Sequence, residues 1–153
     1  NIGFVKYIER IEEEKEKYNL ELNPDFQRGH VWTKEQQVKY LEFFLKGGKS
    51  GRNFYFNLND DSYVLVDGLQ RTTAIWKFVN NQLKVLGQYY TDFYFTRYTT
   101  TSNPLPEFTV NIYRNNLATK KEILEWYVDM NSGGTPHSSE EIERVKEMIR
   151  NIR

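Results

Sequence analysis

A short apolar strand that turns directly into an amphipathic helix constrains this sequence more than any other feature. Residues 63–66 are β-branched or aromatic, as in a buried strand. Asp67 and Gly68 interrupt the run, and the apolar residues that follow recur at helical spacing. The pattern predicts a sharp strand-to-helix turn, with Gln70 and Arg71 in the first turn of the helix.

The start of a helix after such a turn is a candidate anion site. Its first backbone N–H groups lack partners within the helix, and the helix dipole is positive there. A phosphate or carboxylate could bind, and Arg71 would add a charge-assisted contact. Gly68 would let a ligand or a neighbouring backbone come close, while Asp67 could hold a metal ion or accept a hydroxyl proton. The alternative is an Asx turn that only caps the helix, with Arg71 in solvent.

Length and composition indicate one folded domain over residues 1–153. Of the residues, 39% are hydrophobic and 16% aromatic, so rings would fill much of the core and could also stack on bases. The 21 basic and 21 acidic residues balance, so any contact with nucleic acid would be local. The absence of cysteine excludes disulfides and fits a cytoplasmic protein.

No stretch of the sequence resembles a membrane span, which needs roughly 18 apolar residues, and no signal-peptide pattern opens the chain. We therefore expect no membrane partner. The first residue is Asn1 rather than Met, so we expect a trimmed chain or a fragment of a longer protein.

Helical and strand patterns alternate along the chain, which predicts a fold with both element types. Helices are expected over residues 3–18 and 34–46, after the central turn, over 120–130, and from about 138 to the end, and strands over residues 20–22, 53–58, 63–66, 82–86 and 108–113. The segment 87–107 has no clear period and is expected to be a long loop over the site or an inserted segment.

Two Gln-Arg pairs occur in predicted loops. Gln27 and Arg28 lie in a loop shaped by prolines and glycines, and Gln70 and Arg71 begin the central helix. If the fold brings the two pairs together, their side chains could bind a polyphosphate. A divalent cation such as Mg²⁺ on Asp67 could then bridge the phosphates. The alternative for the first pair is an ordinary surface loop.

A Gly-Gly pair follows the predicted helix that ends near residue 130. Gly133 and Gly134 could bring backbone N–H groups near an anion, although a plain helix-to-helix turn is the alternative. Only two histidines are present, His30 and His137, too few for a zinc or HNH-type nuclease centre within this chain. Walker-A, dinucleotide-binding and nucleophile-elbow motifs are all missing.

Three ordered blocks resemble the N-terminal domain family of GmrSD-type modification-dependent restriction enzymes, whose signature is Asp-Gly-Gln-Gln-Arg. Leu69 stands where the signature usually has its first Gln, and the family's partner nuclease domain is not found within the chain. The blocks are Pro-Asp-Phe-Gln-Arg with Val-Trp in residues 24–32, Val-Asp-Gly-Leu-Gln-Arg-Thr-Thr-Ala in residues 66–74, and Met-Asn-Ser-Gly-Gly-Thr-Pro with Glu-Glu in residues 130–141.

The resemblance implies an α+β fold akin to the ParB and sulfiredoxin superfamily: a small mixed β-sheet with helices around a phosphate-binding helix start. It also implies binding, and expected Mg²⁺-dependent hydrolysis, of a nucleoside triphosphate. The domain would act in DNA restriction or phage–host conflict, and its partners would be DNA and a nuclease domain or subunit.

The resemblance further implies roles for individual residues. Asp67 would hold the metal, Gln70 would orient a phosphate or water, and Arg71 would bind phosphate as the third catalytic residue. The remaining nucleotide-binding residues would be Gln27, Arg28, Gly68, Asn131, Gly133 and Gly134.

Two other hypotheses remain open. A non-catalytic module of the same fold could bind DNA or protein through the aromatic segment 89–98, which includes Arg97. A metal-dependent, ParB-like nuclease could instead use Asp67 and nearby acids.

Overall fold

A mixed β-sheet forms the centre of the molecule. The computed structural model describes residues 2–27, 31–46, 48, 51–93, 109–131 and 139–152. Among them, four strands lie in the order β1-β4-β2-β3. Strand β2 is antiparallel to β3 and parallel to β4, and β4 is antiparallel to β1. The strands are β1 (Ile2–Gly3), β2 (Asn53–Leu58), β3 (Tyr63–Asp67) and β4 (Thr109–Asn115).

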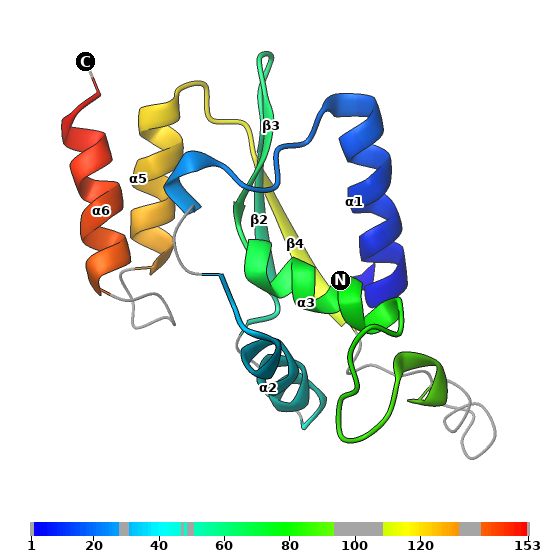
Figure 1. Cartoon of the computed structure of the whole chain (residues 1–153). Coiled ribbons are helices and arrows are strands. Elements are labelled where there is room, and N and C mark those ends of the chain that lie inside the picture. Colours follow the sequence, from blue (N-terminus) through cyan, green and yellow to red (C-terminus); the bar gives the residue numbers. More distant parts are fainter. Residues whose placement is uncertain are drawn as a thin grey trace.

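Helices surround this sheet, so the predicted α+β class is confirmed; the likeness to ParB and sulfiredoxin stays a prediction. Figure 1 shows α1 on one flank of the sheet, α5 and α6 on the other, and α3 crossing beneath the strands. None of the described helices is long and apolar enough to cross a membrane. The helices are α1 (Phe4–Tyr18), the 3₁₀ turn η1 (Asp25–Gln27), α2 (Lys34–Leu45), α3 (Leu69–Val79), α5 (Lys120–Asn131) and α6 (Ser139–Arg150).

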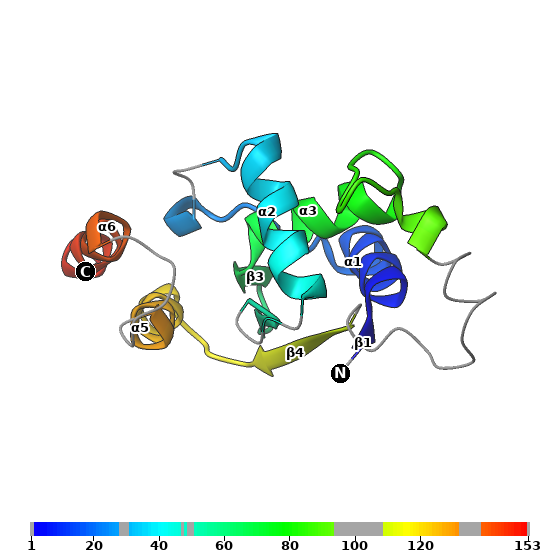
Figure 2. The ribbon, with the colours of Figure 1, turned by 90° about the horizontal axis from the view of Figure 1, so that it is seen from below.

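The sheet separates two hydrophobic cores. The first lies between one sheet face and helices α1, α2 and α3, which Figure 2 shows together on one side of β4. The second joins β3 to η1, α5 and α6. Tyr63 and Leu65 of β3 belong to the first core, and Val64 and Val66 belong to the second. Both faces of β3 are therefore buried, as its unbroken apolar run predicts.

A β-bulge changes the direction of the last residue of β3. Tyr55 lies opposite Asp67 and Phe56 lies opposite Leu65, so Val66 is an extra residue without its own partner on β2. Residues directly opposite each other share a sheet face. The bulge therefore places Asp67 on the same face as Tyr55, towards the second core.

Gly68 makes the turn from β3 into α3 possible. Its φ is +131°, and a Cβ atom built there would lie 2.5 Å from Cδ1 of Phe54, whose side chain is fully buried. The backbone thus closely approaches a core ring at this glycine. Contact of Gly68 with a ligand stays a prediction.

Two expected strands differ in the structure, and one strand was not expected. Residues 20–22 and 82–86 form only single bridges, Glu21 with Val64 and Val85 with Gln88. The Glu21 bridge nevertheless covers the outer edge of β3, with hydrogen bonds to Tyr63 and Leu65 of 2.9 and 2.8 Å. The short strand β1 precedes α1 and was not predicted, since two residues carry no period.

Gly68→Ala should lower the free energy of unfolding by about 2–4 kcal/mol, because it combines backbone strain with overlap against Phe54. Gly87→Ala is the matched control. Gly87 also has a positive φ, +75°, but a Cβ there would meet nothing within 4 Å, so only strain of about 1 kcal/mol is expected. Urea unfolding of both variants measures the difference, and equal losses would contradict the role assigned to Phe54.

Candidate nucleotide site at the start of helix α3

A buried ion pair marks the start of α3. Arg71 Nη2 lies 3.4 Å from Asp67 Oδ1, and the two side chains are 14% and 9% exposed. Arg71 Nη1 donates a hydrogen bond of 2.7 Å to the backbone oxygen of Asn53. The guanidinium carbon also lies 4.8 Å from the centroid of the Phe54 ring. These contacts aim Arg71 at the end of the sheet where β2 begins and β3 ends.

The guanidinium of Arg71 keeps donors for a further partner. It has five N–H groups, and among the described residues it donates one hydrogen bond, to Asn53. Its side chain is held by Asp67 and Phe54 but retains some exposure. An anion that reaches this point would therefore meet a pre-oriented, charge-assisted donor.

Asp67 lies close enough to Tyr127 of α5 to influence the pKa of its hydroxyl. Burial raises the pKa of the Tyr127 hydroxyl well above its usual value, and the negative charges of Asp67 and Glu141 raise it further. Tyr127 therefore stays protonated at neutral pH. Asn131, one turn later, is buried and donates a 2.7 Å hydrogen bond to the Tyr127 backbone oxygen. Asn131 is therefore held within its own helix, and its place in the site stays a prediction.

Gln70 connects α3 to the segment before α2. Its Oε1 accepts a 2.9 Å hydrogen bond from the backbone N–H of Trp32, whose ring contacts that of Tyr40. The side-chain oxygen of Gln70 is therefore engaged in holding the fold, and its amide N–H groups are what it can offer to a ligand. The orienting role expected for Gln70 stays a prediction.

The first Gln-Arg pair lies only partly within the described residues. Arg28, Gly133 and Gly134 fall outside them, as does the side chain of Gln27. The backbone before Arg28 is held by Arg144 of α6, which donates to the carbonyls of Asp25 and Phe26 at 3.2 and 2.5 Å. Convergence of the two Gln-Arg pairs stays a prediction.

The described residues give little support for a permanently bound metal ion. They include no group of three acidic, His or Cys side chains that could hold one. Asp67 supplies a single carboxylate at the start of α3. Mg²⁺ usually binds one or two carboxylates, with water and substrate phosphates completing its six ligands. The donor set therefore fits a cation that enters with a phosphate ligand.

Sequence reasoning missed two residues of α2: Tyr40, which borders Arg71, and the buried Gln37. Burial raises the pKa of Tyr40 well above its usual value, and the positive charges of Arg71 and Arg52 act to lower it, which places Tyr40 near both. One turn earlier in α2, Gln37 is 3% exposed, and its Oε1 has no hydrogen-bond partner among the described residues. The interruption of an apolar helix face by Gln37 is the signal that could have identified it.

A double-mutant cycle tests the Arg71–Asp67 pair. Arg71→Met should cost about 2–4 kcal/mol of stability, because it removes the guanidinium beside the nearly buried Asp67 carboxylate. Adding Asp67→Asn should recover part of that loss, which gives a coupling of about 1 kcal/mol or more. Urea unfolding of the four proteins measures the cycle, and additive losses would show that the pair is not coupled.

Gln37→Met should raise the free energy of unfolding by about 1 kcal/mol, because it removes a buried oxygen to which no described residue donates a hydrogen bond. Gln36→Met is the neighbouring control. Gln36 completes a capping box with Thr33, so its loss should instead lower stability by roughly 0.5–1 kcal/mol. A destabilising Gln37→Met in thermal unfolding would contradict the assignment.

Phe26, Val66 and Met130, one from each of the three sequence blocks, lie in or against the second core. No curated protein and no solved structure matches the chain. The family model of the GmrSD restriction endonuclease N-terminal domain matches residues 8–146, which include all three blocks. The chain therefore belongs to the family of N-terminal domains of GmrSD restriction endonucleases.

Proposed function

We propose that this restriction-enzyme domain binds a nucleoside triphosphate, together with a divalent cation such as Mg²⁺, at the start of α3. The observation that carries the proposal is the buried, oriented guanidinium of Arg71, which donates only one hydrogen bond among the described residues. Family membership supports a role in restriction. The identity of the ligand as a nucleotide is the proposed step.

The backbone at the start of α3 supports a phosphate ligand. The N–H of Thr72 donates 2.8 Å to the Gly68 oxygen, which is the first hydrogen bond of the helix. The N–H groups of Leu69, Gln70 and Arg71 therefore have no partner within α3, and the helix dipole is positive there. A phosphate would combine these donors with the guanidinium.

Each predicted residue has a role in the proposed complex. Arg71 would bind a phosphate directly, Gln70 would donate from its amide to phosphate or water, and Asp67 would share the cation. When bound, the cation would neutralise phosphate charge and polarise the phosphoryl group. Gln27, Arg28, Gly68, Asn131, Gly133 and Gly134 would complete the phosphate-binding surface. Hydrolysis, a cytoplasmic location and coupling to a DNA-cleaving domain or subunit belong to the same proposal.

The two rival hypotheses have less support from the described residues. Tyr90 and Phe93 of the aromatic segment pack their rings on Phe78 at 5.4 and 5.9 Å, so they serve the core rather than a DNA surface. Arg97 lies outside the described residues. A metal-dependent nuclease centre would need acids beside Asp67, and the described residues include no such cluster.

Calorimetric titration tests the nucleotide site directly. ATP, GTP, CTP and UTP are titrated with Mg²⁺ into the wild-type chain and into Arg71→Ala. At least one nucleotide should bind, and the variant should lose at least about tenfold in affinity, because a charge-assisted contact disappears. A phosphate-release assay on wild type and Asp67→Asn then measures turnover.

Arg114→Ala is the matched control for charge. Arg114 is a half-exposed arginine of β4 paired with Glu14 at 2.8 Å, and its loss removes the same charge away from α3. Its nucleotide affinity should equal that of wild type. Unchanged binding by a folded Arg71→Ala, checked by circular dichroism, would overturn the site, as would failure of the wild type to bind any of the four nucleotides.

A further inference from the structure

A row of Tyr and Asn side chains lines one face of strands β2 and β4. The parallel register places Asn53 beside Asn111, and Tyr55 beside Tyr113. Their neighbours Phe54 and Ile112 belong to the first core, so the Tyr and Asn residues lie on the opposite face. We refer to Asn53, Tyr55, Asn111, Tyr113 and the adjoining Trp126 of α5 as the Tyr–Asn face.

The rings of this face form an ordered stack. Those of Tyr55 and Tyr113 are stacked, with centroids 5.2 Å apart and planes at 18°, and Trp126 packs edge-on against Tyr55 at 5.8 Å and 90°. Tyr113 ends the stack and is 47% exposed. Strand β1 pairs with β4 only as far as Val110, so no described strand lies beside Tyr113 on its outer side. Figure 2 shows β4 at this margin of the molecule.

Amide groups provide hydrogen-bonding capacity next to the rings. Asn111 Nδ2 donates to Asn53 Oδ1 at 3.2 Å, and Asn53 Nδ2 lies 3.4 Å from the Tyr55 hydroxyl. Among the described residues, none donates to the side-chain oxygen of Asn111. Asn is disfavoured in strands. Strand stability therefore does not explain why two Asn residues lie beside these rings.

The Tyr–Asn face adjoins the Arg71 site at the end of the sheet, where β2 starts; the guanidinium itself packs on the ring of Phe54, which lies on the other sheet face. The backbone oxygen of Asn53 accepts the hydrogen bond from Arg71, and Asp67 lies opposite Tyr55. One strand spacing and two residues separate Asn53 from Tyr113, which corresponds to about 8 Å between backbones. A ligand as long as a nucleoside triphosphate, extended past the start of β2, would be needed to contact both places.

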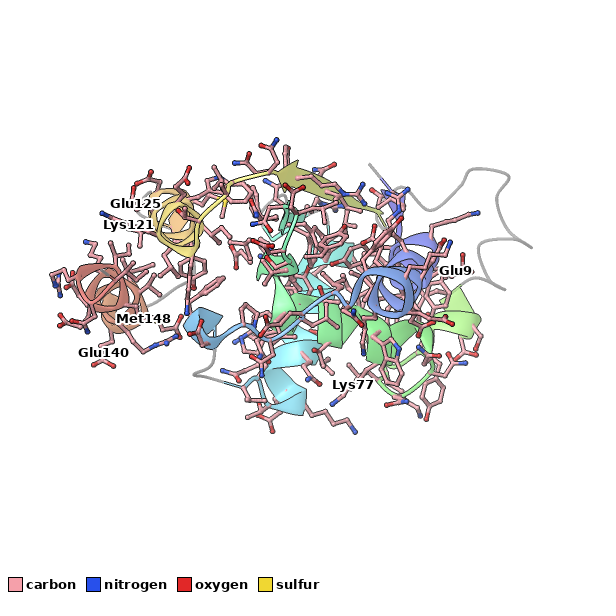
Figure 3. All side chains as sticks on the ribbon, turned by 90° about the horizontal axis from the view of Figure 1, so that it is seen from above. Glu9, Lys77, Lys121, Glu125, Glu140 and Met148 are labelled. Atoms are coloured by element: carbon pink, nitrogen blue, oxygen red, sulfur yellow. The ribbon has the colours of Figure 1, made fainter. Side chains whose placement is uncertain are left out.

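Charge distinguishes a mononucleotide from a nucleic-acid strand as the occupant. Proteins that bind single strands combine stacking rings with cations along the backbone path. The side chains of the Tyr–Asn face are uncharged, and Figure 3 shows the labelled Lys77 and Lys121 at outer edges of the molecule, away from β2 and β4. The arginines closest to the face are engaged elsewhere: Arg52 donates to backbone oxygens, and Arg114 is paired with Glu14. A phosphate at the start of α3 is therefore favoured over a nucleic-acid backbone that runs along the face.

We propose that Tyr113, supported by Tyr55 and Trp126, stacks on the base of the nucleoside triphosphate whose phosphates bind at Arg71. Asn111 would accept a hydrogen bond from the base or the ribose. The proposal rests on the proposed function, because it takes the phosphate position from Arg71. It makes the Tyr–Asn face the part of the site that distinguishes a nucleotide from inorganic polyphosphate.

Calorimetry with two ligands separates the base contact from the phosphate contact. The four nucleoside triphosphates and inorganic tripolyphosphate are titrated with Mg²⁺ into wild type, Tyr113→Leu and Tyr113→Trp. Leu keeps apolar bulk in the strand but lacks a π face, so nucleotide affinity should fall about 5- to 100-fold while tripolyphosphate affinity stays the same. Trp should retain or increase nucleotide affinity.

Tyr18→Leu is the matched control, since Tyr18 is an exposed tyrosine of α1 beside Tyr63, outside the Tyr–Asn face. It should bind every ligand as wild type does. A folded Tyr113→Leu that binds nucleotides normally would overturn the proposed base contact. The proposed phosphate site would still be supported in that case if tripolyphosphate binding depended on Arg71. If Tyr113→Leu instead weakens binding of an oligo-dT strand and spares nucleotides, the face is a nucleic-acid surface and the proposal fails.

Discussion

Burial of strand β3 on both faces is the constraint on which the rest of the molecule depends. Alternate side chains of this strand enter two different cores, so one five-residue strand joins the α1–α2–α3 layer to the α5–α6 pair. Its outer edge is covered by the Glu21 bridge rather than by another strand. A polar substitution at Leu65 or Val66 would therefore disturb one core directly and the other through the shared backbone.

The position of the candidate site follows from the way β3 ends. The extra residue at Val66 directs Asp67 towards α5, and Gly68 then packs its backbone on Phe54 so that α3 begins at once. Arg71, one turn into the helix, consequently reaches back to both Asp67 and the first residue of β2. The site is thus built from backbone geometry before any ligand contributes.

The local part of this arrangement could be predicted from sequence, and the long-range part could not. The strand-turn-helix unit, the capping box at Thr33 and most helices follow from short-range patterns and are confirmed. The parallel pairing of β2 with β4 joins segments that are far apart, and no local pattern encodes it. The Val66 bulge, the Trp32–Gln70 hydrogen bond and the Tyr55–Tyr113 stack depend on that pairing or on tertiary contacts, so they were missed.

Electrostatics explains why a phosphate ligand here would need a cation. In the structure, Arg71 and Asp67 neutralise each other in a nearly buried place. A phosphate that draws on Arg71 adds negative charge beside Asp67, and a buried carboxylate near a second anion is unfavourable without a compensating cation. A divalent ion shared by Asp67 and the phosphate supplies that charge. If a phosphate binds at Arg71 as proposed, the pair that orients Arg71 would make phosphate binding and cation binding depend on each other.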